Sequence, residues 1–240
     1  MAPLVHELRR HPDHFAVEVC LTGQHREMLD QVNAFFGING DYDLSIMSPN
    51  QTLFDVTSKA LLGIGEVLDK AKPDLVFVQG DTTTVFAGAL AAFYKQIKVA
   101  HLEAGLRSWN RYSPFPEEIN RSLTGRIADY HFAPTDRAVA NLQAEGITEN
   151  VWNVGNTVID ALFLGLENIQ SSGMEEKIIN DFSEMVPGFI GLLQTVRAGE
   201  KRIMLVTGHR RESFGEPFQN MCNAMLDIVN QHEDVHLVYP

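Results

Sequence analysis

Three acidic residues sit where an α/β protein places its reactive groups. Asp81 follows the strand-like run Leu75–Val78, Glu103 follows the run Lys98–Ala100, and Glu117 opens a predicted helix further along. The carboxyl ends of parallel strands share one edge of a sheet, where ligands bind. Carboxylates that converge there repel one another, so one can hold a proton while another stays ionised. The pattern predicts a site for paired acid and base chemistry.

A cationic cluster follows a later strand-like run, Ile203–Val206. His209, Arg210 and Arg211 lie there just before a predicted helix. A helix N-terminus and arginine side chains both favour phosphate groups. We therefore interpret this cluster as a clamp for a diphosphate.

Each cluster also has a plain structural alternative. Asp81 could serve only as a helix N-cap, and Glu117 could serve only to favour the positive N-terminus of its helix. Glu103 could form an ordinary surface ion pair with Arg107, and the segment 207–215 could be a solvated loop. The recurrence of such clusters at one sheet edge is what favours the chemical interpretation.

The elements that must position these groups alternate between strand and helix. Several strand-like runs are nearly continuous in Val, Ile, Leu and Phe, which is typical of parallel strands buried on both faces. We predict a doubly wound α/β sheet. The expected strands are Phe15–Leu21, Asp74–Val78, Lys98–Leu102, Tyr130–Ala133, Val151–Val154, Ile203–Val206 and Val235–Tyr239. The expected helices include Thr52–Lys70, Thr83–Gln96, Glu117–Ile127, Asp136–Glu145, Thr157–Ile169 and Glu216–Asn230.

Domain organisation is predicted from a break in this alternation at Gln170–Glu200. We expect an N-terminal Rossmann-like domain over residues 1–170, a linker or insert over 171–200, and the start of a second domain over 201–240. The first helix begins at Ala2 with no strand before it, and the chain stops directly after its last strand. We therefore expect a fragment that lacks its first strand and most of its second domain.

Composition excludes several classes of protein. The 240 residues carry 19 Lys and Arg against 31 Asp and Glu, a formal net charge of −12, which disfavours a nucleic-acid binder. The longest apolar stretch, Val85–Tyr94, is too short to span a membrane. Two isolated cysteines, Cys20 and Cys222, are interpreted as buried thiols in a reducing compartment, so we expect a cytoplasmic protein.

Neither a metal nor a cofactor is expected from the motifs. The sequence His232-Glu-Asp-Val-His236 spells the H-E-x-x-H zinc motif, but that motif needs a helix and Val235–Tyr239 is strand-like. Gly63-Ile-Gly65 lies within a predicted helix and lacks the third glycine of a dinucleotide fingerprint.

Taken together, the motifs resemble those of the non-hydrolysing UDP-N-acetylglucosamine 2-epimerases over nearly the whole chain. The matching segments are Gln24–Gln31, Gly80-Asp81-Thr82-Thr83-Thr84, His101–Arg107, Tyr112–Glu118, Gly155–Asp160 and Gly208-His-Arg-Arg-Glu212. The resemblance implies two Rossmann-like domains facing a cleft, a glycosyltransferase-B-like fold, with the second domain only partly present here. It also implies that an opening Gly-Thr-Arg-Pro-Glu loop is missing.

The activity implied by the resemblance is epimerisation at C2 of UDP-N-acetylglucosamine, giving UDP-N-acetylmannosamine for cell-envelope polysaccharide precursors. UDP is eliminated and then added back, and no cofactor is needed. The resemblance assigns Asp81, Glu103 and Glu117 to the proton transfers, and Asp81 and Glu103 also to substrate binding. It assigns His209 to the phosphates as a further catalytic and substrate-binding group. Arg210 and Arg211 would assist in holding the substrate.

The resemblance further implies regulation and assembly. Gln24, His25, Arg26 and Glu27 would form an allosteric site for a second molecule of UDP-N-acetylglucosamine, and the enzyme would be a homodimer. The present chain alone is expected to be weakly active or inactive. Open alternatives are an epimerase of a uronic-acid-type UDP sugar, a glycosyltransferase of the same architecture, and an inactive fragment that binds nucleotide sugars.

Overall fold

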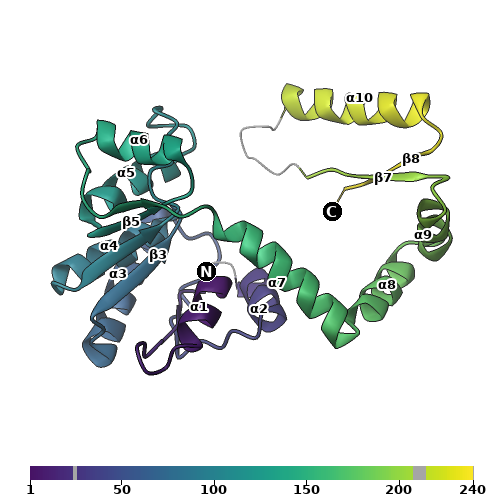
Figure 1. Ribbon diagram of the computed structural model, residues 1–240. Coiled ribbons are helices and arrows are strands. Elements are labelled where there is room, and N and C mark those ends of the chain that lie inside the picture. The colour runs from purple at the N-terminus through teal and green to yellow at the C-terminus, as the bar shows by residue number, and fades with distance from the viewer. Residues whose placement is uncertain (24–25, 208–214, 240) are drawn as a thin grey trace. The chain divides into compact units, whose positions relative to one another are not determined.

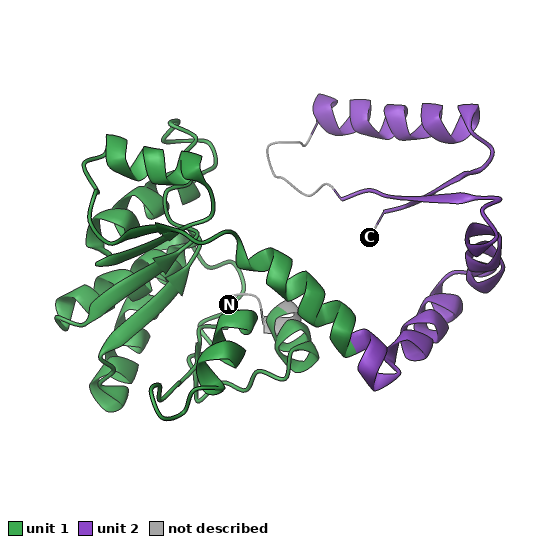
Figure 2. Ribbon diagram, viewed as in Figure 1, with its two compact units in different colours: residues 1–168 green, residues 169–240 purple. Residues whose placement is uncertain are grey.

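The computed structural model describes residues 1–23, 26–207 and 215–239 of the chain. It divides into two compact units, Met1–Asn168 and Ile169–Pro240 (Figure 2). Both units combine helices with parallel strands, so the α/β prediction is confirmed. No helix within the described ranges is both long and apolar enough to cross a membrane.

Unit 1 alternates short strands with helices (Figure 1). Its elements are α1 (Ala2–Arg9), β1 (Cys20–Leu21), α2 (Arg26–Phe35), β2 (Tyr42–Asp43), α3 (Leu53–Ala71), β3 (Leu75–Gln79), α4 (Thr83–Tyr94), β4 (Lys98–Leu102), α5 (Glu117–Ile127), β5 (Tyr130–Ala133), α6 (Asp136–Ala144), β6 (Val151–Asn153) and α7 (Thr157–Ser172), the last of which runs on into unit 2. Strands β3, β4, β5 and β6 pair in that order, all parallel, and β1 pairs with β2.

The main core of unit 1 lies between the four-stranded sheet and helices α3 and α4. Small side chains on α4, including Ala87, Ala89 and Ala92, are completely buried and let this helix approach its neighbours closely. Val78 and Val99 extend the core from the sheet. Because α4 packs against α3, α5, β3 and β4, the loops at the carboxyl ends of these strands have a rigid support.

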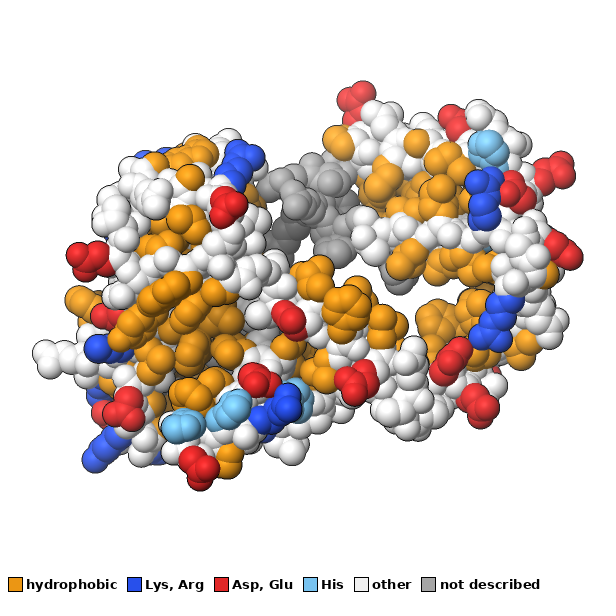
Figure 3. All heavy atoms as spheres, in the orientation of Figure 1, with side chains coloured by type: hydrophobic (Ala, Val, Ile, Leu, Met, Phe, Trp, Pro, Cys, Tyr) orange, Lys and Arg blue, Asp and Glu red, His pale blue; other side chains and the backbone are white. Residues whose placement is uncertain are grey.

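The opposite face of the sheet carries a row of stacked aromatic side chains. Phe132 stacks on Phe77 at 6.3 Å and on Trp152 at 5.4 Å between ring centroids. Apolar side chains gather over this part of unit 1 in Figure 3, and Trp152 is 44% exposed. Parallel sheets are normally covered on both faces, so this face has the composition of a buried one.

Unit 2 contains two helices and a strand–helix–strand segment. Its elements are α8 (Met174–Met185), α9 (Phe189–Arg197), β7 (Arg202–Leu205), α10 (Glu216–Gln231) and β8 (Val235–Val238), with β7 and β8 parallel. The segment 171–200, expected as a linker or insert, is mostly helical. Gly173 and Gly188 adopt positive φ and precede α8 and α9, so the two glycines mark helix starts. The expected strand Phe15–Leu21 is reduced to Cys20–Leu21.

Candidate active site

The three predicted carboxylates come together at the carboxyl ends of β3 and β4. Burial raises the pKa of Asp81, the guanidinium of Arg121 lowers it, and the charges of Glu117 and Glu103 raise it again. These effects place Glu103 and Glu117 within electrostatic reach of Asp81. The structure therefore groups acids that are far apart in the sequence, with Asp81 and Glu117 separated by 36 positions.

The turn that carries Asp81 is built around a glycine. Gly80 has a φ of +82° and its N–H donates to the carbonyl of Leu102 at 3.1 Å. A Cβ added to Gly80 would lie 3.7 Å from Oε2 of Glu103, so the turn passes directly beside that carboxylate. The N-cap of α4 is Thr82, whose hydroxyl accepts the N–H of Val85. The alternative that Asp81 caps this helix is wrong.

Glu103 is held by a neighbouring strand rather than by Arg107. Nε2 of Gln79 donates to Oε1 of Glu103 at 2.7 Å. Arg107 forms a bidentate ion pair with Glu145, with N–O distances of 2.6 and 2.9 Å, and its side chain is only 1% exposed. The expected alternative of a surface ion pair between Glu103 and Arg107 is therefore wrong.

The two acids at the start of α5 have different surroundings. Glu118 is buried, and its two carboxylate oxygens accept the N–H groups of Ser108 and Trp109, both at 2.9 Å. It ties the loop before α5 to the helix. Glu117 instead acts through its charge on Asp81. Of the adjacent pair, Glu118 is the structural acid and Glu117 belongs to the acidic group.

Sequence reasoning missed two residues that hold Asp81. Arg121 pairs with its carboxylate at 2.6 Å, and Nδ2 of Asn120 donates to its backbone carbonyl at 3.0 Å. Arg121 lies four residues after Glu117, which places both on one side of α5. That spacing of acid and arginine was the available signal.

His101 stabilises the same turn through a hydrogen bond to its backbone. The imidazole is completely buried, and its Nε2 lies 2.8 Å from the carbonyl oxygen of Gly80, so this nitrogen donates. Burial lowers the pKa of His101 to about 4. The ring is therefore neutral at physiological pH and holds the Gly80 turn through one hydrogen bond.

This buried histidine predicts a loss of stability in acid. As pH falls from about 6.5 to about 4, the unfolded chain binds a proton that native His101 does not, which destabilises unit 1 by up to about 3 kcal/mol. Urea unfolding followed by tryptophan fluorescence measures this, because both tryptophans, Trp109 and Trp152, lie in unit 1. His101→Gln retains a donor and should lose this share of the pH dependence, whereas exposed His11→Gln should keep it. Equal slopes for both variants would contradict the prediction.

Other predicted site residues lie outside the described part of the chain. This holds for His209, Arg210 and Arg211, and also for Gln24 and His25. Arg26 and Glu27 form the start of α2. The diphosphate clamp and the allosteric site therefore stay predictions.

The two histidines of the H-E-x-x-H spelling lie at different elements. His236 lies in β8 and His232 follows the last residue of α10, so the two histidines do not share a helix. Among the described residues, no group of three or more His, Cys, Asp and Glu side chains is arranged to hold a metal ion.

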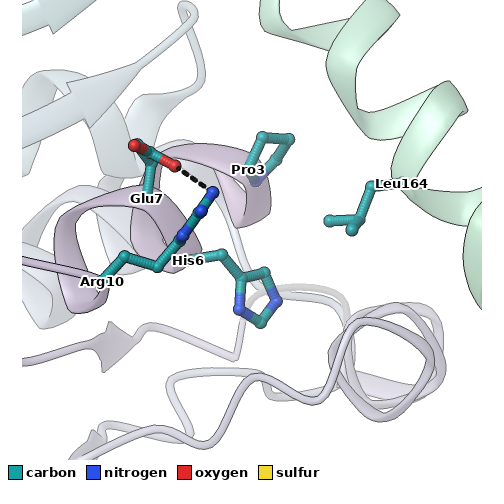
Figure 4. A pocket seen from close by; sticks show the side chains of 5 residues that line it. All are labelled: Pro3, His6, Glu7, Arg10 and Leu164. Carbon is teal, nitrogen blue, oxygen red and sulfur yellow. Dashed lines mark hydrogen bonds and ion pairs between the residues drawn. The ribbon is translucent and has the colours of Figure 1, made fainter.

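A shallow hollow between α1 and α7 is separate from the acidic group. It is lined by Pro3, His6, Glu7, Arg10 and Leu164 (Figure 4). Its polar side chains already have partners: Arg10 pairs with Glu7 at 3.1 Å, and His6 contacts the carbonyl of Phe36 at 2.7 Å. None of the three carboxylates lines this hollow, so it is not a part of the candidate active site.

Known proteins of the same type match the chain throughout. It is 48% identical over 241 residues to the UDP-N-acetylglucosamine 2-epimerase of Escherichia coli (strain K12), a match that covers all of this chain and 61% of that protein. A crystal structure of UDP-GlcNAc 2-epimerase from Neisseria meningitidis bound to UDP-GlcNAc is 42% identical, with a TM-score of 0.88 over all of this chain and 62% of that one. A Methanocaldococcus jannaschii UDP-GlcNAc 2-epimerase in complex with UDP-GlcNAc and UDP is 34% identical, with a TM-score of 0.74, covering all of this chain and 62% of that one.

The match extends to the level of a family model. The model described as UDP-N-acetylglucosamine 2-epimerase matches residues 6–240. The chain spans about three fifths of the length of the relatives above. With the motifs, the fold and the family model in agreement, this chain belongs to the UDP-N-acetylglucosamine 2-epimerase family.

Proposed function

We propose that this chain is the sugar-side part of an enzyme that inverts C2 of UDP-N-acetylglucosamine to give UDP-N-acetylmannosamine, for cell-envelope polysaccharide precursors. The observation that carries the proposal is the grouping of Asp81, Glu103 and Glu117. It is further supported by relatives whose structures were determined with UDP-GlcNAc and UDP. Because the chain spans about 61% of a relative's length, the activity is proposed for the full-length enzyme.

The chemistry follows from the weak acidity of the C2 proton. No carbonyl group adjoins C2, so direct deprotonation is difficult. Elimination avoids this: a base takes the C2 proton while the C1–O bond to UDP breaks, which leaves a C1–C2 double bond. Addition of UDP back to C1, with protonation of C2 from the other face, completes the inversion. Atoms and electrons balance without a redox cofactor.

Two groups of residues divide this work. Asp81, Glu103 and Glu117 supply the proton acceptors and donors that the two faces of C2 require. Burial and two neighbouring acids raise the pKa of Asp81, so it holds a proton more readily than an ordinary aspartate. His209, Arg210 and Arg211 hold the diphosphate and stabilise the negative charge of departing UDP.

Isotope exchange tests the reaction directly. The full-length enzyme is incubated with UDP-N-acetylglucosamine in heavy water, and deuterium at C2 is measured by mass spectrometry and NMR. We expect deuterium at C2 in both sugar epimers. An epimerase of a uronic-acid-type UDP sugar would show exchange only with that sugar. A glycosyltransferase would form product only when an acceptor is supplied, and an inactive binding fragment would show no exchange. Absence of exchange with UDP-N-acetylglucosamine in the full-length enzyme contradicts the proposal.

Regulation is proposed for the start of α2. Gln24, His25, Arg26 and Glu27 would bind a second molecule of UDP-N-acetylglucosamine and activate the enzyme. The support is the match of this segment to the family's sequence pattern, together with its position directly before and within the first turn of α2. A substrate-dependent lag or sigmoidal rate curve that disappears in Arg26→Ala would support this role.

We also propose a homodimer formed through α3 and α4. Phe54 and Leu62 lie eight residues apart on α3 and are 86% and 70% exposed, and Phe93 and Tyr94 at the end of α4 are 58% and 65% exposed. Helices α3 and α4 pack side by side. Large exposed apolar side chains on neighbouring helices favour a protein interface.

The dimer proposal predicts the effect of one surface charge. Leu62→Asp should convert a dimer to a monomer. An unpaired carboxylate buried at the interface would weaken the free energy of association by about 2–5 kcal/mol. Size-exclusion chromatography with light scattering measures the mass. Leu226→Asp on α10 is the matched control, since Leu226 is 61% exposed and lies in unit 2. A wild-type monomer, or a dimer that survives Leu62→Asp, would contradict the prediction.

A further inference from the structure

We propose that Arg121 is a positioning residue for this reaction, which fixes the carboxylate of Asp81 in place beside two other acids. The inference rests on the proposed function and deepens it. It assigns a role to a residue that the sequence motifs did not single out.

The contact between the two side chains is short and shielded from water. Nη2 of Arg121 lies 2.6 Å from Oδ2 of Asp81, and the side chains are 13% and 26% exposed. An ion pair in such a setting is screened less than one on the surface. Asn120 donates to the backbone carbonyl of Asp81 at 3.0 Å. Two consecutive residues of α5 therefore hold the carboxylate and the backbone of the same aspartate.

The guanidinium is itself anchored at its other side. Nη1 of Arg121 lies 3.6 Å from Oε2 of Glu118, whose side chain is 5% exposed. Glu118 in turn accepts the N–H groups of Ser108 and Trp109. This series of contacts connects the loop before α5 to Asp81 through Arg121. The contacts on both sides of the guanidinium restrict the orientation of the arginine side chain.

Arg121 is also the cation paired with Asp81 beside two other acids, and the amino group of Met1 interacts with one of those acids, Glu103. Those acids are Glu117, on the same helix as Arg121, and Glu103, at the end of β4. His101 contributes no positive charge at neutral pH, because burial keeps it neutral. Burial, Glu117 and Glu103 all raise the pKa of Asp81, and the charge of Arg121 lowers it. Without the arginine, Asp81 would be protonated at a higher pH and would lose its fixed orientation.

A titration of Asp81 in the 240-residue chain tests the electrostatic part without any activity. Aspartate carboxyl carbons are labelled with ¹³C, and the Asp81 signal is identified by its loss in Asp81→Asn. We expect Arg121→Gln to raise the pKa of Asp81 by at least about one unit, a tenfold change in its ionisation equilibrium. Arg126→Gln removes a charge from an exposed site on the same helix and should leave the titration unchanged. Equal titrations in Arg121→Gln and Arg126→Gln would overturn the inference.

Kinetics of the full-length enzyme test the positioning part. We expect Arg121→Gln to lower kcat about 100-fold with little change in KM, and to move the limb of the pH–rate profile that depends on Asp81 to higher pH. Arg121→Lys keeps the charge but loses the planar fork, so it should keep the wild-type limb while kcat still falls about tenfold. If Arg121→Lys had a wild-type kcat, the positioning role would be overturned.

The two experiments separate the possible failures. A wild-type enzyme without exchange at C2 would remove the proposed function, while the titration would still decide whether Arg121 controls Asp81. Should Arg121→Gln fail to fold, as shown by circular dichroism, Arg121→Lys carries the kinetic measurement. An unaltered kcat in that folded variant would then overturn the inference.

Discussion

Glu117→Gln in the full-length enzyme lowers kcat at least about 10³-fold and leaves the Kd for UDP unchanged within about twofold. The amide is nearly the same size as the carboxyl group but cannot take up or release a proton, and general acid–base groups contribute about 10²–10⁴-fold to rate. Glu117 acts on Asp81 through its charge, at the site proposed for C2. The decisive measurements are steady-state turnover and isothermal titration with UDP.

The adjacent acid supplies a matched control for this result. Glu118→Gln keeps only one acceptor oxygen for the two N–H groups of Ser108 and Trp109. It should therefore lower the free energy of unfolding of unit 1 by about 1–3 kcal/mol. Glu117→Gln should leave that free energy unchanged. A loss of UDP affinity in Glu117→Gln as large as its loss of turnover would indicate a structural role for Glu117 and contradict the prediction.

Gly105→Ala should destabilise unit 1 by at least about 3 kcal/mol, the largest stability effect that we expect from one added methyl group. Gly105 has a φ of +85°, which disfavours any side chain. A Cβ at this position would also lie 2.8 Å from the carbonyl carbon of Ala138 and still closer to its oxygen. The neighbour is helix backbone, fixed further by the bond from Asn141 Nδ2 to the Gly105 carbonyl at 2.9 Å, so it cannot give way easily.

Gly146→Ala separates backbone strain from the steric clash. Gly146 has a similar φ of +78°, but nothing lies within 4 Å of the added Cβ. This variant should cost only about 1–2 kcal/mol. Urea unfolding followed by tryptophan fluorescence reports unit 1 for both variants. Similar losses in Gly105→Ala and Gly146→Ala would show that the contact with Ala138 has no energetic weight.

The amino-acid pattern was sufficient to place the principal elements and the three acids. Parallel strands such as β3 have a near-continuous apolar composition. The helix starts at Thr52 and Thr82 are marked by capping residues. Because parallel strands end at a common edge, Asp81 and Glu103 were expected to meet. The positions of strands and their ends therefore followed from local patterns.

The partners of these acids did not follow from local patterns. The Arg107–Glu145 and Arg121–Asp81 pairs join residues 38 and 40 positions apart, and each choice depends on how helices pack over the sheet. The short sequence distance between Glu103 and Arg107 allowed an ion pair between them as an alternative, but Arg107 pairs with Glu145 instead. Likewise, nothing in the letters Glu117-Glu118 says which acid is buried, since that depends on the direction in which α5 leaves its loop.

The first two turns of α5 have a consequence for attempts to rebuild this chemistry elsewhere. One short stretch of helix carries Glu117, the arginine that pairs with Asp81, the amide that donates to the Asp81 carbonyl, and the acid that accepts the N–H groups of the loop before the helix. A designer who copied only the three carboxylates onto another scaffold would obtain acids without the contacts that hold Asp81 in place. The smallest transplantable piece is the helical segment with all four side chains, seated against a glycine turn.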